Sequence, residues 1–310
     1  MTLSFTALSG RNAPDELPLA GLLADLPLPD LCSQRRLMDA TTSELLRSRA
    51  APEPRVIHRR EPRTSRASAS GRHVNSNGIE KQMTTLTQKP LSSLLDRLFI
   101  DAETAEESLE QEMRDIPPEQ RAQEGADYRQ LYARLRDQPL PVSRATGALL
   151  YMLARSIGAQ NIVEFGTSFG ISTLHLAAVF RDNGGGRLIG SEFEPSKAAR
   201  ARENLAAANL SDLVDIREGD ALETFAHDLP QLIDLVLLDG AKVLYPSILC
   251  LLEDRLRVGA LIVADNADAS PDYLAWVRSI ERGYLSVPFA EDVELSTRIG
   301  TAGSGSASQA

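Results

Sequence analysis

Oxygen-bearing side chains follow two apolar runs in the second half of the chain. The run LIDLVLLD ends in Asp239, and the run ALIVADN ends in Asp265 and Asn266. If the two runs are neighbouring parallel strands, their carboxyl ends bring these side chains into one crevice. Two carboxylates and an amide form an oxygen donor set that suits magnesium, calcium or manganese better than zinc and leaves positions for water or substrate. The alternative interpretation is that both aspartates only cap the loops that follow.

Lys242 lies three residues after Asp239, close enough in the chain to face the same crevice. Burial and a neighbouring cation both disfavour an ammonium group, and the neutral amine is the form that a general base needs. Lys242 is therefore the candidate base for a substrate held at this site. The alternative is a lysine exposed at the surface.

Glycines mark a second candidate site, in the stretch VEFGTSFGIS. An apolar run ends there in Glu164, and Gly166 and Gly170 precede a helical pattern. Glycine tolerates positive φ and lets a ligand approach the backbone, so this spacing predicts a ligand-binding turn at the end of a strand. A dinucleotide fingerprint that starts at Gly166 would need two more glycines where the chain has Ser168 and Ile171. The sequence therefore argues against NAD.

Two further acids follow the next two predicted strands. Glu192 stands about 20 residues beyond the glycine turn, where a carboxylate can accept hydrogen bonds from both ribose hydroxyls of a nucleoside. Asp220, in the sequence EGDA, lies in the next loop along the same edge and can accept a hydrogen bond from an adenine amino group. The alternative for both residues is a solvated acid at the end of a strand or in a loop.

Strands alternate with helices through this half of the chain and would position these groups. After the glycine turn, we expect strands over 187–193, 214–217, 232–238 and 260–264, with helices over 195–208, 221–227 and 245–256 between them. A helix over 271–282 and two strands over 284–288 and 293–298 close the chain. This alternation predicts an α/β fold whose mostly parallel, seven-stranded sheet carries an antiparallel hairpin at one edge.

Composition divides the chain into four segments. Residues 1–82 mix arginine with Ser, Ala and Pro without a helical or strand period, which predicts disorder. A basic nucleic-acid arm, a presequence and a translation start at Met83 are the alternatives for this segment. We expect residues 83–142 to form a helical cap, residues 143–300 the α/β domain, and residues 301–310 a disordered tail.

The cap is predicted from helical spacing. Its first helix has leucines at i, i+3, i+4 and i+7, from Leu91 to Leu98. Further helices are expected over 102–114, after Pro117 and Pro118, and over 143–157. The helix after the prolines has an apolar stripe formed by Tyr128, Leu131, Tyr132 and Leu135. We expect the cap to serve as a lid and as the interface of a possible homodimer.

Charge and cysteine content limit the classes of partner. The net charge of −10 is uneven, because residues 1–82 carry 12 Lys and Arg against 9 Asp and Glu, which leaves −13 for the rest. An acidic domain attracts nucleic acid poorly, so a small-molecule substrate is favoured. No apolar run reaches the ~20 residues of a membrane-spanning helix. Cys32 and Cys250 are far apart and lack metal-ligand spacing, which favours a reducing compartment, so we expect a cytoplasmic protein.

Together these motifs make residues 142–298 similar to the metal-dependent O-methyltransferases typified by catechol O-methyltransferase and caffeoyl-CoA O-methyltransferase. VEFGTSFGIS resembles the turn that binds S-adenosylmethionine (SAM), and SEFEP holds the ribose-binding acid. LLDGAK resembles the segment with the first metal ligand and the catalytic lysine, and VADN supplies the other two ligands. The resemblance implies a class I, Rossmann-like methyltransferase fold.

The resemblance also implies a role for individual residues. Lys242 would be the general base, and Asp239, Asp265 and Asn266 would hold a divalent cation, with magnesium the expected metal. The cofactor SAM would be contacted by Glu164, Gly166, Thr167, Ser168, Gly170, Ser172, Glu192, Phe193, Asp220, Ala221 and Asp239.

A small hydroxylated, catechol-like molecule is the substrate that this family favours. One alternative is methylation of a hydroxylated uridine in tRNA, which the acidic domain disfavours and the arginine-rich N-terminal segment favours. Another is a SAM-binding regulatory module without catalysis, although the set Asp239, Lys242, Asp265 and Asn266 is complete.

Overall fold

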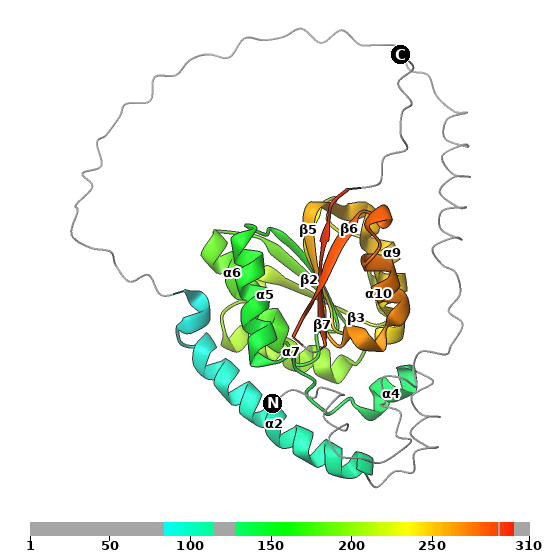
Figure 1. The fold of residues 1–310 in the computed structure, drawn as a ribbon. Coiled ribbons are helices and arrows are strands. Elements are labelled where there is room, and N and C mark those ends of the chain that lie inside the picture. The colour runs from blue at the N-terminus through cyan, green and yellow to red at the C-terminus, as the bar shows by residue number, and fades with distance from the viewer. Residues whose placement is uncertain (1–83, 115–127, 291, 301–310) are drawn as a thin grey trace, which may run out of the picture. The chain divides into compact units, whose positions relative to one another are not determined.

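The computed structural model describes residues 84–114, 128–290 and 292–300 (Figure 1). The predictions of disorder for residues 1–82 and 301–310, and the expected helix start after Pro117 and Pro118, lie outside the described residues. None of the described helices combines the length and the apolar character needed to cross a membrane.

A seven-stranded sheet forms the centre of the described fold, with strand order β3-β2-β1-β4-β5-β7-β6. Its strands are β1 (Asn161–Phe165), β2 (Arg187–Glu192), β3 (Val214–Glu218), β4 (Ile233–Leu238), β5 (Leu256–Ala264), β6 (Tyr284–Phe289) and β7 (Val293–Arg298). The first five strands pair in parallel, and β7 joins β5 and β6 antiparallel. The predicted mostly parallel sheet with a closing hairpin is confirmed.

The order of the strands places a ligand site at the centre of the sheet. β1 lies between β2 and β4, so the chain proceeds to one side of β1 and then crosses to the other. In an open α/β sheet, the carboxyl ends of strands at such a switch point leave a crevice between diverging loops. The glycine turn follows β1 and Asp239 follows β4, so both candidate sites meet there.

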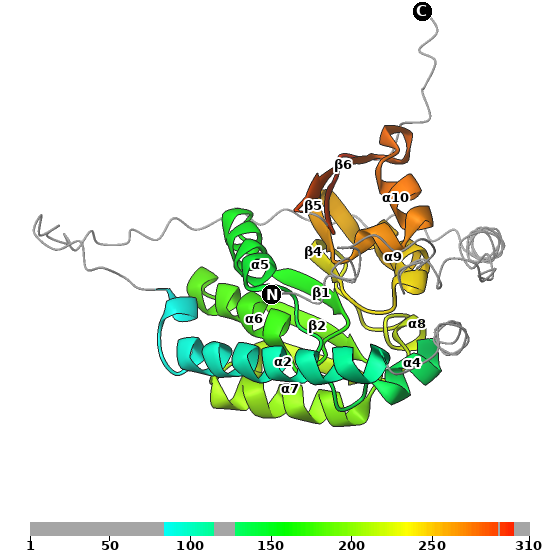
Figure 2. The ribbon, with the colours of Figure 1, turned by 60° about the horizontal axis from the view of Figure 1, so that its bottom comes forward.

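Helices cover both faces of the sheet and enclose a separate hydrophobic core on each (Figure 2). One face is covered by α2 (Leu91–Arg114), α5 (Arg144–Ser156), α6 (Ile171–Asn183) and α7 (Pro195–Ala207). The other is covered by α8 (Ala221–Thr224), α9 (Tyr245–Leu252) and α10 (Pro271–Val277), while α4 (Tyr128–Arg134) packs beside this second core. Single 3-10 turns occupy Thr85–Thr87, Ser211–Leu213, Lys242–Leu244, Glu253–Arg255, Ala267–Ala269 and Ile280–Arg282.

The first cap helix differs from the prediction. Two helices were expected across 91–114, but α2 runs through both without a break. The sequence between Leu98 and Ala102 contains no glycine or proline, so nothing interrupts the backbone hydrogen bonds. Leu91, Leu98 and Phe99 bury their side chains in the core on this face of the sheet. The length of the helix follows from helix-forming residues and its position from this buried stripe.

Three predicted helices are too long, and the one expected over 221–227 already ends at Thr224. The helix expected over 245–256 ends at Leu252, because β5 already begins at Leu256, four residues earlier than predicted. Arg257 on this early part of β5 forms an ion pair with Asp234 of β4, at 2.5 Å. The helix expected over 271–282 ends at Val277, and a 3-10 turn leads to Gly283, whose φ of 81° reverses the chain into β6.

Candidate active site

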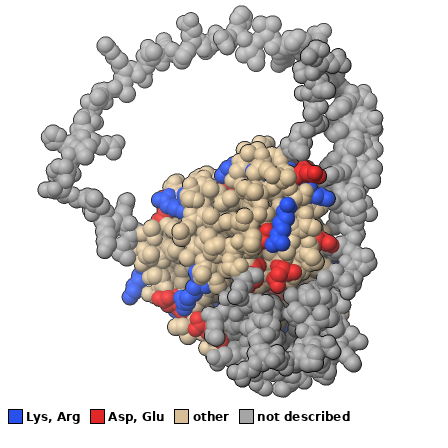
Figure 3. All heavy atoms as spheres, viewed as in Figure 1, with Lys and Arg blue, Asp and Glu red and all other residues tan. Residues whose placement is uncertain are grey.

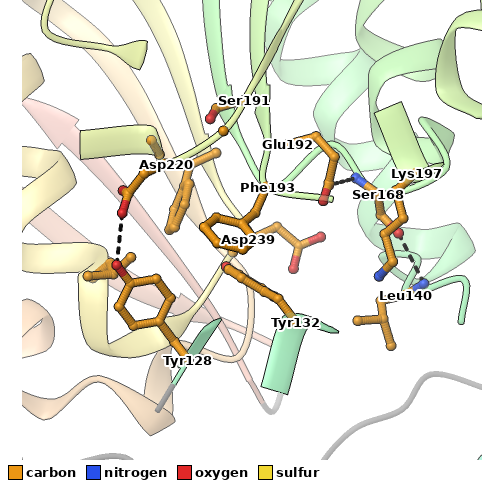
Figure 4. A pocket seen from close by; sticks show the side chains of 16 residues that line it. Tyr128, Tyr132, Leu140, Ser168, Ser191, Glu192, Phe193, Lys197, Asp220 and Asp239 are labelled. Atoms are coloured by element: carbon orange, nitrogen blue, oxygen red, sulfur yellow. Dashed lines mark hydrogen bonds between the residues drawn. The ribbon is translucent and has the colours of Figure 1, made fainter. Parts of the chain in front are cut away.

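A cleft opens at the carboxyl ends of β1, β2 and β4, beside the loop that follows β3 (Figure 4). The space between its walls, with the open mouth included, is about 490 Å³. The predicted cofactor contacts that line it are Gly166, Ser168, Glu192, Phe193, Asp220, Ala221 and Asp239.

The two motif glycines hold the loops around the cleft in place. Gly166 has a φ of 96°, and a side chain there would overlap the backbone oxygen of Asp239. The backbone N–H of Asp239 also donates to the carbonyl oxygen of Phe165, at 2.8 Å. Gly170, with a φ of 84°, caps the N-terminus of α6. The glycine turn thus lets the loops after β1 and β4 touch, which sets Asp239 at the edge of the cleft.

Glu164 lies behind the wall of the cleft. Its carboxylate accepts hydrogen bonds from the hydroxyls of Thr167 (3.1 Å), Ser172 (2.7 Å) and Thr173 (2.6 Å). Burial raises the pKa of Glu164 to about 7, although the three hydroxyls oppose this shift. Four predicted cofactor contacts, Glu164, Thr167, Gly170 and Ser172, are therefore absent from the cleft lining. These residues instead stabilise the glycine turn from the side away from the cleft.

Glu192 lines the cleft from the end of β2. Its two carboxylate oxygens accept from the backbone N–H groups of Ser168 (2.6 Å) and Glu194 (2.9 Å). Burial raises the pKa of this carboxyl group, and the two amides and the charge of Lys197 oppose the shift. The amide of Ser168 belongs to the glycine turn, so Glu192 ties the ends of β1 and β2 together.

Asp220 is the meeting point of the loop after β3 and helix α4. Its carboxylate caps α8 through the N–H of Leu222 (3.0 Å) and accepts from the hydroxyl of Tyr128 (2.9 Å) and the guanidinium of Arg129 (3.0 Å). Burial alone would raise the pKa of Asp220, but these hydrogen bonds outweigh it and hold the pKa below its usual value. Asp220 is thus held as a carboxylate.

Aromatic rings from α4 form one wall of the cleft. The ring of Tyr132 lies 5.3 Å from that of Phe193, and the ring of Tyr128 lies 6.4 Å from it, measured between centroids. The hydroxyl of Tyr132 accepts from the backbone N–H of Ala241, at 2.5 Å. The sequence presented these tyrosines as an apolar helix stripe, so their place at the site was missed.

Lys242 and Asp239 face each other across one turn of chain. The Lys242 Nζ lies 3.2 Å from Asp239 Oδ1 and 5.4 Å from the centroid of the Tyr245 ring. Both side chains are largely shielded from solvent. Burial raises the pKa of Asp239, and the ion pair with Lys242 opposes that shift only in part. The predicted base and the first predicted metal ligand are therefore in direct contact.

Asp265 and Asn266 follow β5, beside Asp239 in the neighbouring loop. Both are buried, with 5% and 7% of their surface exposed. Asn266 has a φ of 47°, a conformation that few residues other than glycine adopt. Its Nδ2 donates to Asp292 Oδ2 at 3.2 Å, which leaves its side-chain oxygen for another partner. Burial and the charge of Asp239 both raise the pKa of Asp265.

This donor set fits a divalent cation. Among the described residues, neither the Asp265 carboxylate nor the side-chain oxygen of Asn266 accepts a hydrogen bond. Carboxylate and amide oxygens are the ligands that magnesium and other hard cations take. The described ranges contain no group of three or more His, Cys, Asp or Glu side chains that could hold a metal, so the amide of Asn266 is needed to complete the set. Asp239, Asp265 and Asn266 are the residues that could hold Mg²⁺.

Lys197 is a residue of the cleft that the sequence analysis missed. It stands in the first turn of α7, only 3% exposed, and lines the cleft beside Glu192. Burial lowers the pKa of Lys197, against the opposing charges of Glu192, Glu194 and Asp239. Its position five residues after Glu192, at the start of a helix, was the available signal.

Two further observations concern the surface and the core of the described chain. On the face shown in Figure 3, Lys and Arg side chains are scattered among neutral and acidic residues of the described chain. His175 is buried, and its Nδ1 lies 2.8 Å from the carbonyl oxygen of Ile171. It belongs to the core and not to the cleft.

The matched region of known proteins coincides with the part of the chain that builds the cleft. The family described as Methyltransferase domain matches residues 163–267. This range runs from β1 to the loop after β5 and includes Glu164, Glu192, Asp239, Lys242 and Asn266.

Catechol O-methyltransferases are among the similar proteins. The enzyme from Niastella koreensis is 37% identical over 134 residues, which cover 41% of this chain and 58% of that protein. Catechol O-methyltransferase B from Danio rerio is 32% identical over 171 residues, which cover 53% of this chain and 64% of that protein. The chain thus spans about three fifths of the length of these relatives.

A solved structure gives the same result for the fold. Cofactor-bound Rv0187 from MTB aligns with a TM-score of 0.51 and 22% identity, over 69% of this chain and 93% of that one. The match to the family described as Methyltransferase domain falls on the part of the chain that builds the cleft, the fold is similar to that of Rv0187, and the sequence is similar to catechol O-methyltransferases.

Proposed function

We propose that this chain is a SAM-dependent O-methyltransferase that methylates a small substrate with two adjacent hydroxyls, with the help of a divalent cation. The observation that carries the proposal is that Asp239, which contacts Lys242, also lines the cleft. The cleft with Glu192 and Asp220 suits a nucleoside, and it meets the contact between Asp239 and Lys242 at the end of β4. The similarity to catechol O-methyltransferases supports the reaction and the substrate class.

The residues of the cleft would orient the cofactor. Glu192 can accept hydrogen bonds from ribose hydroxyls, because each of its oxygens has a lone pair beyond those engaged by backbone amides. The rings of Phe193 and Tyr132 offer apolar surface for adenine, next to Asp220. This arrangement would direct the methyl group toward Asp239.

Lys242 would accept the proton of the attacking hydroxyl at its Nζ. The substrate oxygen then forms a bond to the methyl carbon as the bond from that carbon to sulfur breaks, which yields a methyl ether and S-adenosylhomocysteine. A divalent cation held by Asp239, Asp265 and Asn266 would supply positive charge that favours the ionised hydroxyl. Alignment of the oxygen, carbon and sulfur atoms in a fixed site can contribute ~7 to 11 kcal/mol to such a displacement.

Methyl transfer from labelled SAM to catechol, measured with magnesium and with excess chelator, tests the proposal. We expect transfer with magnesium and a loss of transfer with chelator. Equal rates in both conditions would contradict the role of the cation. No transfer to any catechol or hydroxycinnamate by a protein that binds S-adenosylhomocysteine would contradict the substrate class and favour methylation of tRNA or a regulatory role.

A further inference from the structure

Lys197 is a buried cation that faces the cleft. Its side chain leaves the first turn of α7, lines the cleft and points into it on the side of Glu192 (Figure 4). Only 3% of the residue is exposed. Within the described ranges, its ammonium group makes no hydrogen bond and no ion pair. An ammonium group that faces a cleft and is not hydrogen-bonded to an acid can bind an anionic group of a ligand there.

The other cations at the cleft already have partners. Lys242 contacts Asp239 at 3.2 Å, and Arg129 contacts Asp220 at 3.0 Å. Glu192 lies beside Lys197, but its oxygens accept from two backbone amides instead. The acids of this cleft thus leave Lys197 without a direct contact in the described part of the chain.

The position of Lys197 indicates which part of a ligand it meets. In Figure 4, Asp220 and the ring of Tyr128 lie at one end of the cleft, whereas Lys197 lies at the other, with Ser168 and Leu140. Glu192 and Asp239 lie between these two ends. If the adenine end of a nucleoside cofactor lies at Asp220, the chain attached to its ribose extends toward Lys197.

We propose that Lys197 binds the carboxylate of the amino-acid portion of SAM and of S-adenosylhomocysteine. The inference rests on the proposed function, because it takes its ligand from there. SAM carries a sulfonium, an ammonium and one carboxylate, so the carboxylate is its single anionic group. Lys197 therefore selects a cofactor that retains its amino acid over a bare nucleoside thioether, and it holds the cofactor at the end opposite to adenine.

Calorimetric titration with two ligands tests this assignment. The ligands are S-adenosylhomocysteine and its decarboxylated analogue, which keeps the nucleoside, the thioether and the amine. For the wild-type protein, we expect S-adenosylhomocysteine to bind about tenfold or more tightly than the analogue, as for a charge-assisted hydrogen bond. In Lys197→Met, this ratio should fall to near one. Lys197→Arg should retain most of it, since a cation remains.

Arg200→Met provides the matched control, because Arg200 is an exposed cation one turn further along α7 that pairs with Glu203. This variant should bind both ligands as the wild type does. If Lys197→Met keeps the wild-type ratio of affinities, the assignment is wrong. The same holds if Lys197→Met binds S-adenosylhomocysteine normally but has a raised KM only for a catechol that bears a carboxylate, since Lys197 then serves the substrate. A wild-type protein that binds neither ligand would instead overturn the proposed cofactor.

Discussion

The two halves of the site, at the ends of β1 to β3 and at the ends of β4 and β5, satisfy their acids in different ways. In the half formed by β1, β2 and β3, Glu164 accepts from three hydroxyls and Glu192 from two backbone amides. In the half formed by β4 and β5, Asp239 has Lys242 as its partner, and the Asp265 carboxylate has no hydrogen-bond donor among the described residues. The acids of the first half all have hydrogen-bond donors, whereas the second half has an excess of negative charge.

The first half fixes the positions of its carboxylates, and the second half accumulates negative charge. Neutral donors in the first half fix the position of each carboxylate, as a site that must orient a ligand requires. In the second half, burial raises the pKa values of both Asp239 and Asp265, and the charge of Asp239 raises the pKa of Asp265 further. Such a pair becomes stable as two carboxylates when a cation binds between or beside them. Four substitutions test the contrast, from the largest expected effect to the smallest.

Asp265→Asn removes one of the two repelling charges. We expect kcat to fall about a thousandfold, because several kcal/mol of charge stabilisation are lost with the cation. Without cation, the variant should melt at a higher temperature than the wild type. The pKa of Asp265 is about 4 in the unfolded chain and is raised in the folded protein. Ionisation of this carboxyl group therefore lowers the free energy of unfolding as the pH rises from the unfolded pKa to the folded pKa.

Melting curves with magnesium and with chelator check this prediction. Magnesium should raise the melting temperature of the wild type but not that of Asp265→Asn. Asp268→Asn is the control, since Asp268 lies in the next turn and is exposed. An equal response to magnesium in Asp265→Asn would show that the cation binds elsewhere.

Lys242→Met removes the proposed base and leaves unchanged the half formed by β1, β2 and β3, which we call the cofactor half. We expect kcat to fall by about 10² to 10⁴, the range for a general base, while the Kd for S-adenosylhomocysteine changes little. Single-turnover methyl transfer and calorimetry measure the two effects separately. Lys89→Met, at an exposed lysine before α2, should match the wild type in both. A large loss of cofactor affinity in Lys242→Met would show that Lys242 binds the cofactor, which contradicts its proposed role as the base.

Glu192→Gln changes the cofactor half by one charge. The amide is similar in size but binds ribose hydroxyls less strongly than a carboxylate, so the Kd for S-adenosylhomocysteine should rise roughly ten- to a hundredfold. The melting curve should respond to magnesium as in the wild type. Glu203→Gln, an exposed position on α7, serves as the control. An unchanged Kd would remove Glu192 from the proposed cofactor contacts.

Tyr132→Phe should have the smallest effect. It removes the acceptor of the Ala241 N–H, so we expect the free energy of unfolding to fall by about 1 kcal/mol and kcat to stay within about threefold of the wild type. Urea denaturation measures the first quantity. Tyr284→Phe, which loses a hydrogen bond to Glu253 far from the cleft, should lower stability without any change in cofactor affinity. A loss of activity as large as that of Lys242→Met would contradict a packing role for the Tyr132 hydroxyl.

The sequence predicted the sheet well because the strands are short apolar runs between clear turn signals. It also identified Asp239, Lys242, Asp265 and Asn266 as strand-end neighbours, and the structure brings Lys242 into contact with Asp239 and Asn266 close to Asp292. The end of a strand is visible in the sequence as the point where an apolar run gives way to polar residues. In a parallel sheet, the polar residues after neighbouring strands then lie at the same edge.

Other features depend on contacts that no local pattern contains. Glu164 and Ser172 resemble cofactor contacts in the motif, but their hydrogen bond to each other turns them away from the cleft. The spacing of Tyr128 and Tyr132 shows a helix stripe but not that it packs against Phe193. Lys197 looks like any lysine in a first helical turn, and only the surrounding fold buries it.

Helix α4 joins the two halves of the cleft. Tyr128 and Arg129 hold Asp220 in the loop after β3, while Tyr132 holds Ala241 in the loop after β4. Withdrawal of this short helix breaks both sets of contacts at once. The loop at the proposed adenine end of the cleft and the loop that carries Asp239 would then be released at the same time. Displacement of α4 would therefore free the loops after β3 and β4 together.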